Sequence, residues 1–135
     1  MILAEGGLSI ESDSCKYFLE VFMADIIYID VDEGTKRVMN NSKLYAKLLS
    51  KFKDDQSINQ INTALAGGDM AIAKDYTHTL KGLAANLSLT ELYKHCMELE
   101  DQIKAGAAVT DKYSIVKEVY NQTIKEADKV IEQYA

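Results

Sequence analysis

Apolar residues recur every three or four positions along most of the chain, which is the spacing of one face of an α-helix. The clearest stripes fall at residues 42–52, 70–87, 92–103 and 113–131. Proline is absent from the sequence, so no such residue interrupts these segments. Connections of about two to six residues between long helices favour antiparallel neighbours. The pattern therefore predicts an all-α protein whose core is an up-down antiparallel four-helix bundle.

Capping residues and glycines mark the ends of these segments. Asp30 begins an acidic capping pattern and predicts the start of a short helix. The Gly-Gly pair at 67–68 predicts a helix end, and Asp69 predicts the cap of the next helix. Residues 88–91 read Ser-Leu-Thr-Glu, a capping box that would open the helix at 92–103. A change of apolar phase predicts a bend near residues 53–56.

The region before Asp30 has a different pattern from the rest. Its first dozen residues contain glycines and serines and resemble a loose leader. From about residue 14 to residue 27, apolar residues again recur at helical spacing. We therefore divide the chain into residues 1–29, a leader or extra helix, and residues 30–135, the bundle domain. The fold prediction includes one or two additional N-terminal helices.

Composition and charge restrict the possible partners. The 135 residues contain 15 basic and 21 acidic side chains, which gives a net charge of −6. This surface repels phosphate backbones, so we expect no nucleic-acid binding. Two cysteines form no disulfide framework, and no apolar run reaches the roughly 18 residues of a membrane span. We expect a cytoplasmic monomer without a signal peptide and without membrane contact.

His78 lies on the side of its predicted helix that faces away from the core. At about 100° per residue, the apolar side chains of this helix gather on one side, which we expect to be buried: Ile72, Ala73, Tyr76, Leu80, Leu83 and Leu87. The histidine falls almost opposite them. Its neighbours on that outward face are small or charged: Ala71, Lys74, Asp75, Lys81, Gly82 and Ala85.

Gly82 and Lys81 indicate what an exposed imidazole could do here. A glycine in a helix interior costs about 1 kcal/mol relative to alanine. Gly82 stands one turn after His78 on the same face, where it leaves room for another molecule to approach the ring. Lys81 places a cation within reach of anything attached to that ring. Nucleophile, cation and open access together favour acceptance of a phosphoryl group.

The string His-Thr-Leu-Lys-Gly at 78–82 resembles the His-x-x-Lys-Gly signature of the histidine-containing phosphotransfer (HPt) domain family. Further stretches extend the resemblance over roughly residues 30–106: Ile-Asp-x-x-x-Gly at 29–34, Ala-Leu-x-x-Gly-Asp at 64–69 and Cys-x-x-Leu-Glu at 96–100. One departure is Ser88, where the family usually has glycine. Because Ser88 can cap the next helix, we expect changed turn chemistry and unchanged function.

The resemblance implies a phosphorelay protein and not an enzyme. HPt domains accept a phosphoryl group from an aspartyl phosphate on a receiver domain and pass it to another receiver, in systems that include a sensor or hybrid histidine kinase. By the same resemblance, His78 is the acceptor, Lys81 stabilises phosphoryl charge, and Gly82 keeps the docking surface open. The rest of the outward face is expected to contact the receiver: Ala71, Lys74, Asp75 and Ala85. No cofactor or ATP site is implied, and the Mg²⁺ used in transfer belongs to the receiver.

Two other functions fit parts of the sequence. A di-iron bundle needs two Glu-x-x-His pairs, whereas this chain has Asp75-x-x-His78 and Glu91-x-x-x-His95. His95 lies beside the apolar seam of its helix and is better explained as a boundary histidine. The more serious alternative is a phosphate-independent adaptor that binds receiver or kinase domains through its helical face. The presence of histidine, lysine and glycine together argues against the adaptor.

Overall fold

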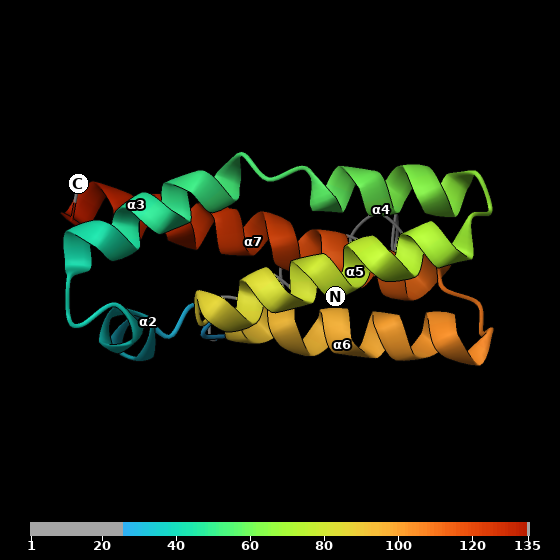
Figure 1. Ribbon diagram of the computed structural model, residues 1–135, viewed down its shortest axis with the longest axis horizontal. Coiled ribbons are helices and arrows are strands. Elements are labelled where there is room, and N and C mark those ends of the chain that lie inside the picture. The colour runs from blue at the N-terminus through green and yellow to red at the C-terminus, as the bar shows by residue number, and fades with distance from the viewer. Residues whose placement is uncertain (1–25, 135) are drawn as a thin grey trace, which may run out of the picture.

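The structure is a computed structural model that describes residues 26–134. The predicted helix at 14–27 lies outside the described residues except for its last two positions. The elements of the described part are all α-helices (Figure 1): α2 (Val31–Arg37), α3 (Ser42–Lys53), α4 (Ser57–Ala66), α5 (Met70–Asn86), α6 (Thr90–Ala105) and α7 (Thr110–Tyr134). None of them combines the length and the apolar content that crossing a bilayer requires.

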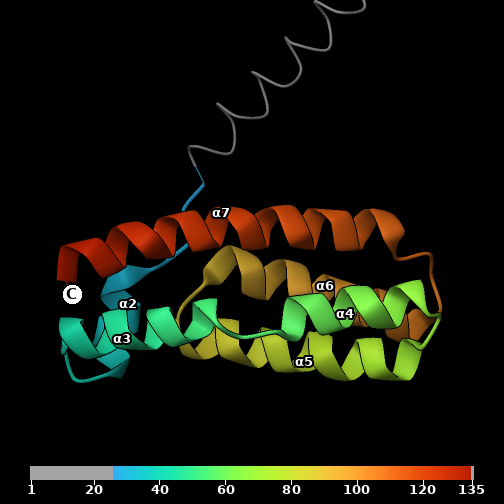
Figure 2. The same cartoon turned by 90° about the horizontal axis from the view of Figure 1, so that it is seen from above.

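The helices form an antiparallel up-down bundle. Helices α3 and α4 run one after the other in the same direction, and α5 returns along α4 (Figure 1). Helix α6 then packs against α5, and α7 packs against both α6 and α3. Helix α7 is 25 residues long, and Figure 2 shows it extending along most of the length of the bundle. The predicted fold class is confirmed, and α2 is an additional N-terminal helix.

The bend predicted near residues 53–56 separates α3 from α4. Asp54 ends α3, and the Asp55 carboxylate accepts a hydrogen bond from the Ser57 backbone N–H at 2.9 Å. The two helices can therefore present their apolar faces in different directions. Leu49 and Ile61, one from each helix, are both fully buried. The break between α3 and α4 therefore explains why the apolar positions change phase in the sequence.

The core begins slightly earlier in the chain than the expected domain start at residue 30. Tyr28 and Ile29 are both buried, and they pack with core residues of the bundle. The backbone N–H of Asp30 also donates to the carbonyl oxygen of Ser88 at 2.9 Å. These contacts attach residues 28–30 to the end of α5, before α2 begins.

The buried face of α5 matches the predicted one except at Ile72. Ile72 was expected in the core, but it is 42% exposed, whereas Thr77 is fully buried. Because α5 packs between α4 and α6, small buried residues such as Ala73 and Ala84 allow close approach on both sides. The Thr77 hydroxyl donates to the Ala73 carbonyl at 2.7 Å, which satisfies its polar group inside the core. The prediction for Ile72 is therefore wrong: helical periodicity places it near the apolar side, but this residue of the first turn of α5 stays 42% exposed.

Ser88 lies in the turn just after α5 and does not cap α6, so the predicted capping box is wrong. Its φ is +59°, in the left-handed region. The backbone N–H of Leu89 donates to the Ala84 carbonyl at 2.8 Å, the long hydrogen bond of a Schellman turn. The Ser88 hydroxyl donates to Glu33 of α2 at 2.8 Å. The Ser88 side chain thus links the α5–α6 turn to α2. Glycine could adopt the same left-handed backbone conformation without steric cost.

A pair of substitutions isolates the conformational cost at this turn. Ser88→Gly and Ser88→Ala both remove the hydrogen bond to Glu33. Only alanine keeps the Cβ atom that opposes a left-handed φ, a penalty of about 1 kcal/mol. We therefore expect Ser88→Gly to be more stable than Ser88→Ala by about 1 kcal/mol in urea unfolding. Equal unfolding midpoints would contradict the left-handed assignment.

Candidate functional site

His78 lies in the middle of α5 and points to solvent, with 68% of its side chain exposed. Its Nδ1 atom is 3.1 Å from Oε2 of Glu100 on α6. No residue of the described part hydrogen bonds to the other ring nitrogen, Nε2. One edge of the imidazole is therefore held by the protein, and the opposite edge is open to a partner.

Glu100 organises the site. Its side chain is only 5% exposed, and its two oxygens have different partners. Oε1 accepts a hydrogen bond from Lys81 Nζ at 2.7 Å, and Oε2 contacts His78. Lys104 Nζ lies 3.6 Å from Oε2, at ion-pair distance. The carboxylate therefore ties α5 to α6 and joins the histidine to two lysines.

The residue-by-residue prediction did not assign a role to Glu100. Glu100 was noted only as the last residue of the Cys-x-x-Leu-Glu stretch at 96–100 that resembles the HPt family. A signal was present in the sequence, because Glu100 stands four residues after Cys96 on the apolar seam of its helix. A carboxylate in that register must be paired if it is buried. Its partners could not be named from the sequence because they lie on a neighbouring helix.

The charges of the site fix the tautomer of His78. Burial opposes ionisation of Glu100, but the hydrogen bonds from Lys81 and His78 outweigh it and hold the pKa of this carboxyl below its usual range. The hydrogen bond between Lys81 and Glu100 also raises the pKa of Lys81, whereas burial lowers it. Glu100 is therefore ionised at neutral pH and can only accept hydrogen bonds. In the neutral imidazole the proton lies on Nδ1, and Nε2 carries the free lone pair.

The surface around His78 is open. No atom outside the helix backbone lies within 4 Å of the position that a Cβ atom on Gly82 would occupy. Ala71 and Asp75 are exposed as well, whereas Lys74, Lys81 and Ala85 are half-buried. Beyond Gly82, Ala85 and Tyr93 take part in lining a shallow hollow of about 310 Å³ that reaches Arg37 of α2. The residues of the predicted outward face therefore form one surface on α5, and this surface continues onto α6.

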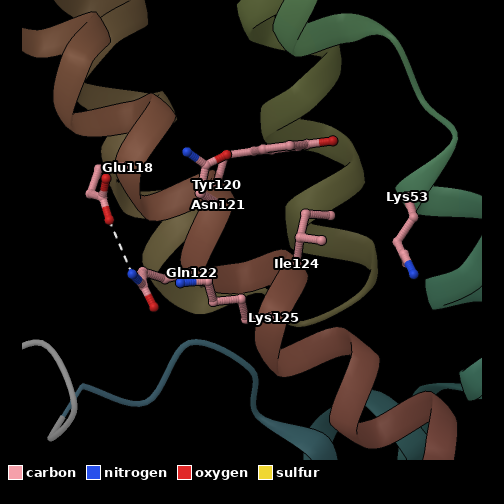
Figure 3. A pocket seen from close by; sticks show the side chains of 7 residues that line it. All are labelled: Lys53, Glu118, Tyr120, Asn121, Gln122, Ile124 and Lys125. Carbon is pink, nitrogen blue, oxygen red and sulfur yellow. Dashed lines mark hydrogen bonds between the residues drawn. The ribbon is translucent and has the colours of Figure 1, made fainter.

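A second, larger hollow of about 540 Å³ lies on α7 and includes none of these residues (Figure 3). Glu118 and Gln122 hydrogen bond to each other at one side of it, at 3.0 Å. Lys53 stands apart from that pair in the picture and pairs with Asp128. The polar groups do not converge on a common point, so this hollow offers no comparable chemistry.

His95 lies between α6 and α7 in a different kind of environment. Its Nδ1 accepts a hydrogen bond from the buried Lys112 ammonium at 2.8 Å, and Lys112 also pairs with Glu98. Burial and the Lys112 charge lower the pKa of His95. The ring is therefore neutral, only 18% exposed, and already uses the lone pair on Nδ1. Within the described residues, no group of three or more His, Cys, Asp or Glu side chains is arranged to hold a metal ion.

Residues 47–130, more than half of the chain, match the family model of the Hpt domain. The chain belongs to the Hpt domain family. The match runs from α3 into α7 and includes His78, Lys81, Gly82 and Glu100. Searches among curated proteins and among solved structures found no significant match. Membership confirms the resemblance seen in the sequence and implies phosphotransfer in two-component relays.

Proposed function

We propose that this Hpt domain is a phosphorelay intermediate. His78 accepts a phosphoryl group from the aspartyl phosphate of one receiver domain and passes it to the aspartate of another. The observation that supports this role best is the exposed His78 ring, whose Nδ1 edge contacts the buried, ionised Glu100. This contact leaves the lone pair of Nε2 directed toward an approaching partner.

The transfer involves no net loss or gain of a proton by His78. The Nε2 lone pair attacks phosphorus, the bond between phosphorus and the aspartyl oxygen breaks, and the receiver's carboxylate leaves. The proton on Nδ1 stays in place, so the phosphorylated ring becomes cationic. Glu100 faces that proton at 3.1 Å and stabilises the developing charge. In the reverse direction the same contacts hold the ring while the phosphoryl group leaves.

Lys81 and the surrounding surface have separate tasks. The Lys81 ammonium neutralises charge on the phosphoryl group during transfer. It also holds Glu100 from the opposite oxygen, at 2.7 Å. Gly82, with Ala71, Lys74, Asp75 and Ala85, forms the face on which a receiver docks. We infer that Mg²⁺ is bound by the receiver and that phosphoryl groups enter the relay from a sensor or hybrid histidine kinase. The relay then operates in the cytoplasm, and this chain acts as a carrier without kinase activity.

One experiment separates this function from that of a phosphate-independent adaptor. The protein is incubated with a phosphorylated receiver and run on a phosphate-affinity gel. We expect a shifted band whose label is lost in acid and retained in base, as for a phosphoramidate. Binding of the receiver without any transfer of label would instead support the adaptor.

Glu100→Gln tests the chemical part of the proposal. Glutamine keeps the size of the side chain and an oxygen for Nδ1, but the charge is lost. A neutral hydrogen bond is weaker than a charge-assisted one by about 1–1.5 kcal/mol, which corresponds to about tenfold in rate. We expect labelling of His78 to slow about tenfold with a receiver and also with acetyl phosphate, measured on phosphate-affinity gels.

Asp101→Asn is the matched control for this variant. Asp101 is exposed on the same helix and acts on Lys81 only through space, so the substitution removes the same charge near the site while the carboxylate that holds His78 stays in place. Its labelling rate should stay within twofold of the parent rate. If Glu100→Gln labels as fast as Asp101→Asn, Glu100 does not assist transfer.

A further inference from the structure

Lys104 is the third positively charged or hydrogen-bonding group that approaches Glu100. It stands one turn after Glu100 in the last turn of α6, and 55% of its side chain is exposed. Its Nζ lies 3.6 Å from Oε2, the same oxygen that contacts His78 Nδ1. This distance is too long for a hydrogen bond. Lys104 is therefore attracted to the site electrostatically while its side chain remains free to turn.

The site carries more positive charge than Glu100 neutralises. Among the side chains in contact with Glu100, two ammonium groups and one carboxylate leave a net charge of about +1, and the exposed Asp101 acts on Lys81 only through space. A phosphoryl group brings up to two negative charges. In the same step the His78 ring becomes cationic, so its Nδ1 proton competes more strongly for Oε2. Lys104 then loses attraction to Glu100 at the moment when a stronger anion appears on the ring.

We propose that Lys104 is a second phosphoryl-binding residue, kept beside His78 by Glu100 until the phosphoryl group arrives. The inference rests on the proposed function of His78. In the transfer step the phosphorus–oxygen bond to the receiver's aspartate breaks, the Nε2–phosphorus bond forms, and the aspartate leaves as a carboxylate. Lys104 then turns from Oε2 to a phosphoryl oxygen, and Glu100 keeps the Nδ1 proton. Lys81 and Lys104 would thus reach the phosphoryl group from two helices, α5 and α6.

The test compares Lys104→Gln with Lys94→Gln and Lys104→Arg. Lys94 is an exposed lysine of the same helix, so its substitution makes the same change in net charge. Each protein is phosphorylated by a receiver, and the pH titration of phospho-His78 is followed by phosphorus-31 NMR. The second measurement is the equilibrium division of label between His78 and the receiver.

Loss of Lys104 should raise the pKa of the phosphoryl group by about 0.7 unit, the effect of one charge in contact, about 4 Å away, in water-like surroundings. The equilibrium should move about fivefold toward the receiver, because phosphorylated His78 loses an attraction of that size when the cation is removed. Lys104→Arg should restore both values, and Lys94→Gln should change neither. A general loss of helix stability would not produce this set of shifts.

The outcomes separate the two proposals. If the parent protein is not phosphorylated on His78, the proposed function fails and this inference fails with it. If the parent is phosphorylated but Lys104→Gln titrates and equilibrates like Lys94→Gln, only the role of Lys104 is overturned. A Lys104→Arg protein that behaves like Lys104→Gln also overturns it, since the proposal requires a cation and not one particular side chain.

Discussion

His78→Gln is expected to abolish phosphorylation, both by a phosphorylated receiver and by acetyl phosphate. The amide of glutamine has no nucleophilic lone pair on nitrogen, so no phosphoramidate can form. The fold should be unaffected, because the ring is 68% exposed. Glutamine can also donate a hydrogen bond to Glu100, as Nδ1 does. The melting temperature should stay within about 3 °C of the parent value.

His95→Gln provides the control for this experiment. It removes the second of the two histidines, one whose ring is largely buried and hydrogen-bonded to Lys112. We expect this variant to be labelled like the parent protein, although it can be less stable because the buried ammonium loses a partner. Label that persists in His78→Gln, or that disappears in His95→Gln with the fold intact, would contradict the assignment of His78.

Much of the fold could be predicted because it depends on signals that are local in the sequence. The cap at Asp69 and the helix end at Gly68, whose φ is +75°, follow from the local preferences of those residues. The break between α3 and α4 was visible as a change of apolar phase. The outward position of His78 followed from helical periodicity. Each of these features needs only the positions of neighbouring residues along one helix.

The features that were missed depend on contacts between helices. The buried face of α5 is set by close packing against α4 and α6, which buries Thr77 and Ala84 and leaves the larger Ile72 exposed. Ser88 was assigned to the start of α6, although its hydroxyl contacts Glu33 of α2, 55 residues away. Glu100 is the most important case, because its function depends on partners from α5. One sequence provides the buried carboxylate but does not show which cations surround it.

Gly82→Gln is expected to separate docking of the receiver from the chemistry of His78. The position lies on the open face of α5, and no neighbouring side chain approaches an added Cβ atom within 4 Å. Loss of a helix-interior glycine should stabilise the fold by about 0.5–1 kcal/mol. The long side chain would instead occupy space that a receiver needs in order to align its aspartyl phosphate with Nε2. A displacement of about 1 Å can cost about 100-fold in rate.

We therefore expect Gly82→Gln to melt at or above the parent temperature and to accept label from a receiver about 100-fold more slowly. Labelling by acetyl phosphate should remain within a few-fold of the parent rate, because a small donor needs no docking surface. Gly82→Ala serves as the matched control, with at least the same gain in helix stability and a much smaller obstruction. Its transfer rate should fall between those of the parent and Gly82→Gln. If Gly82→Gln unfolds, the glycine is needed for packing; if acetyl phosphate labelling falls as far as receiver transfer, the side chain disturbs the imidazole itself. Only a slower labelling rate with the receiver, at an unchanged rate with acetyl phosphate, would show that a protein partner docks on the open surface beside His78.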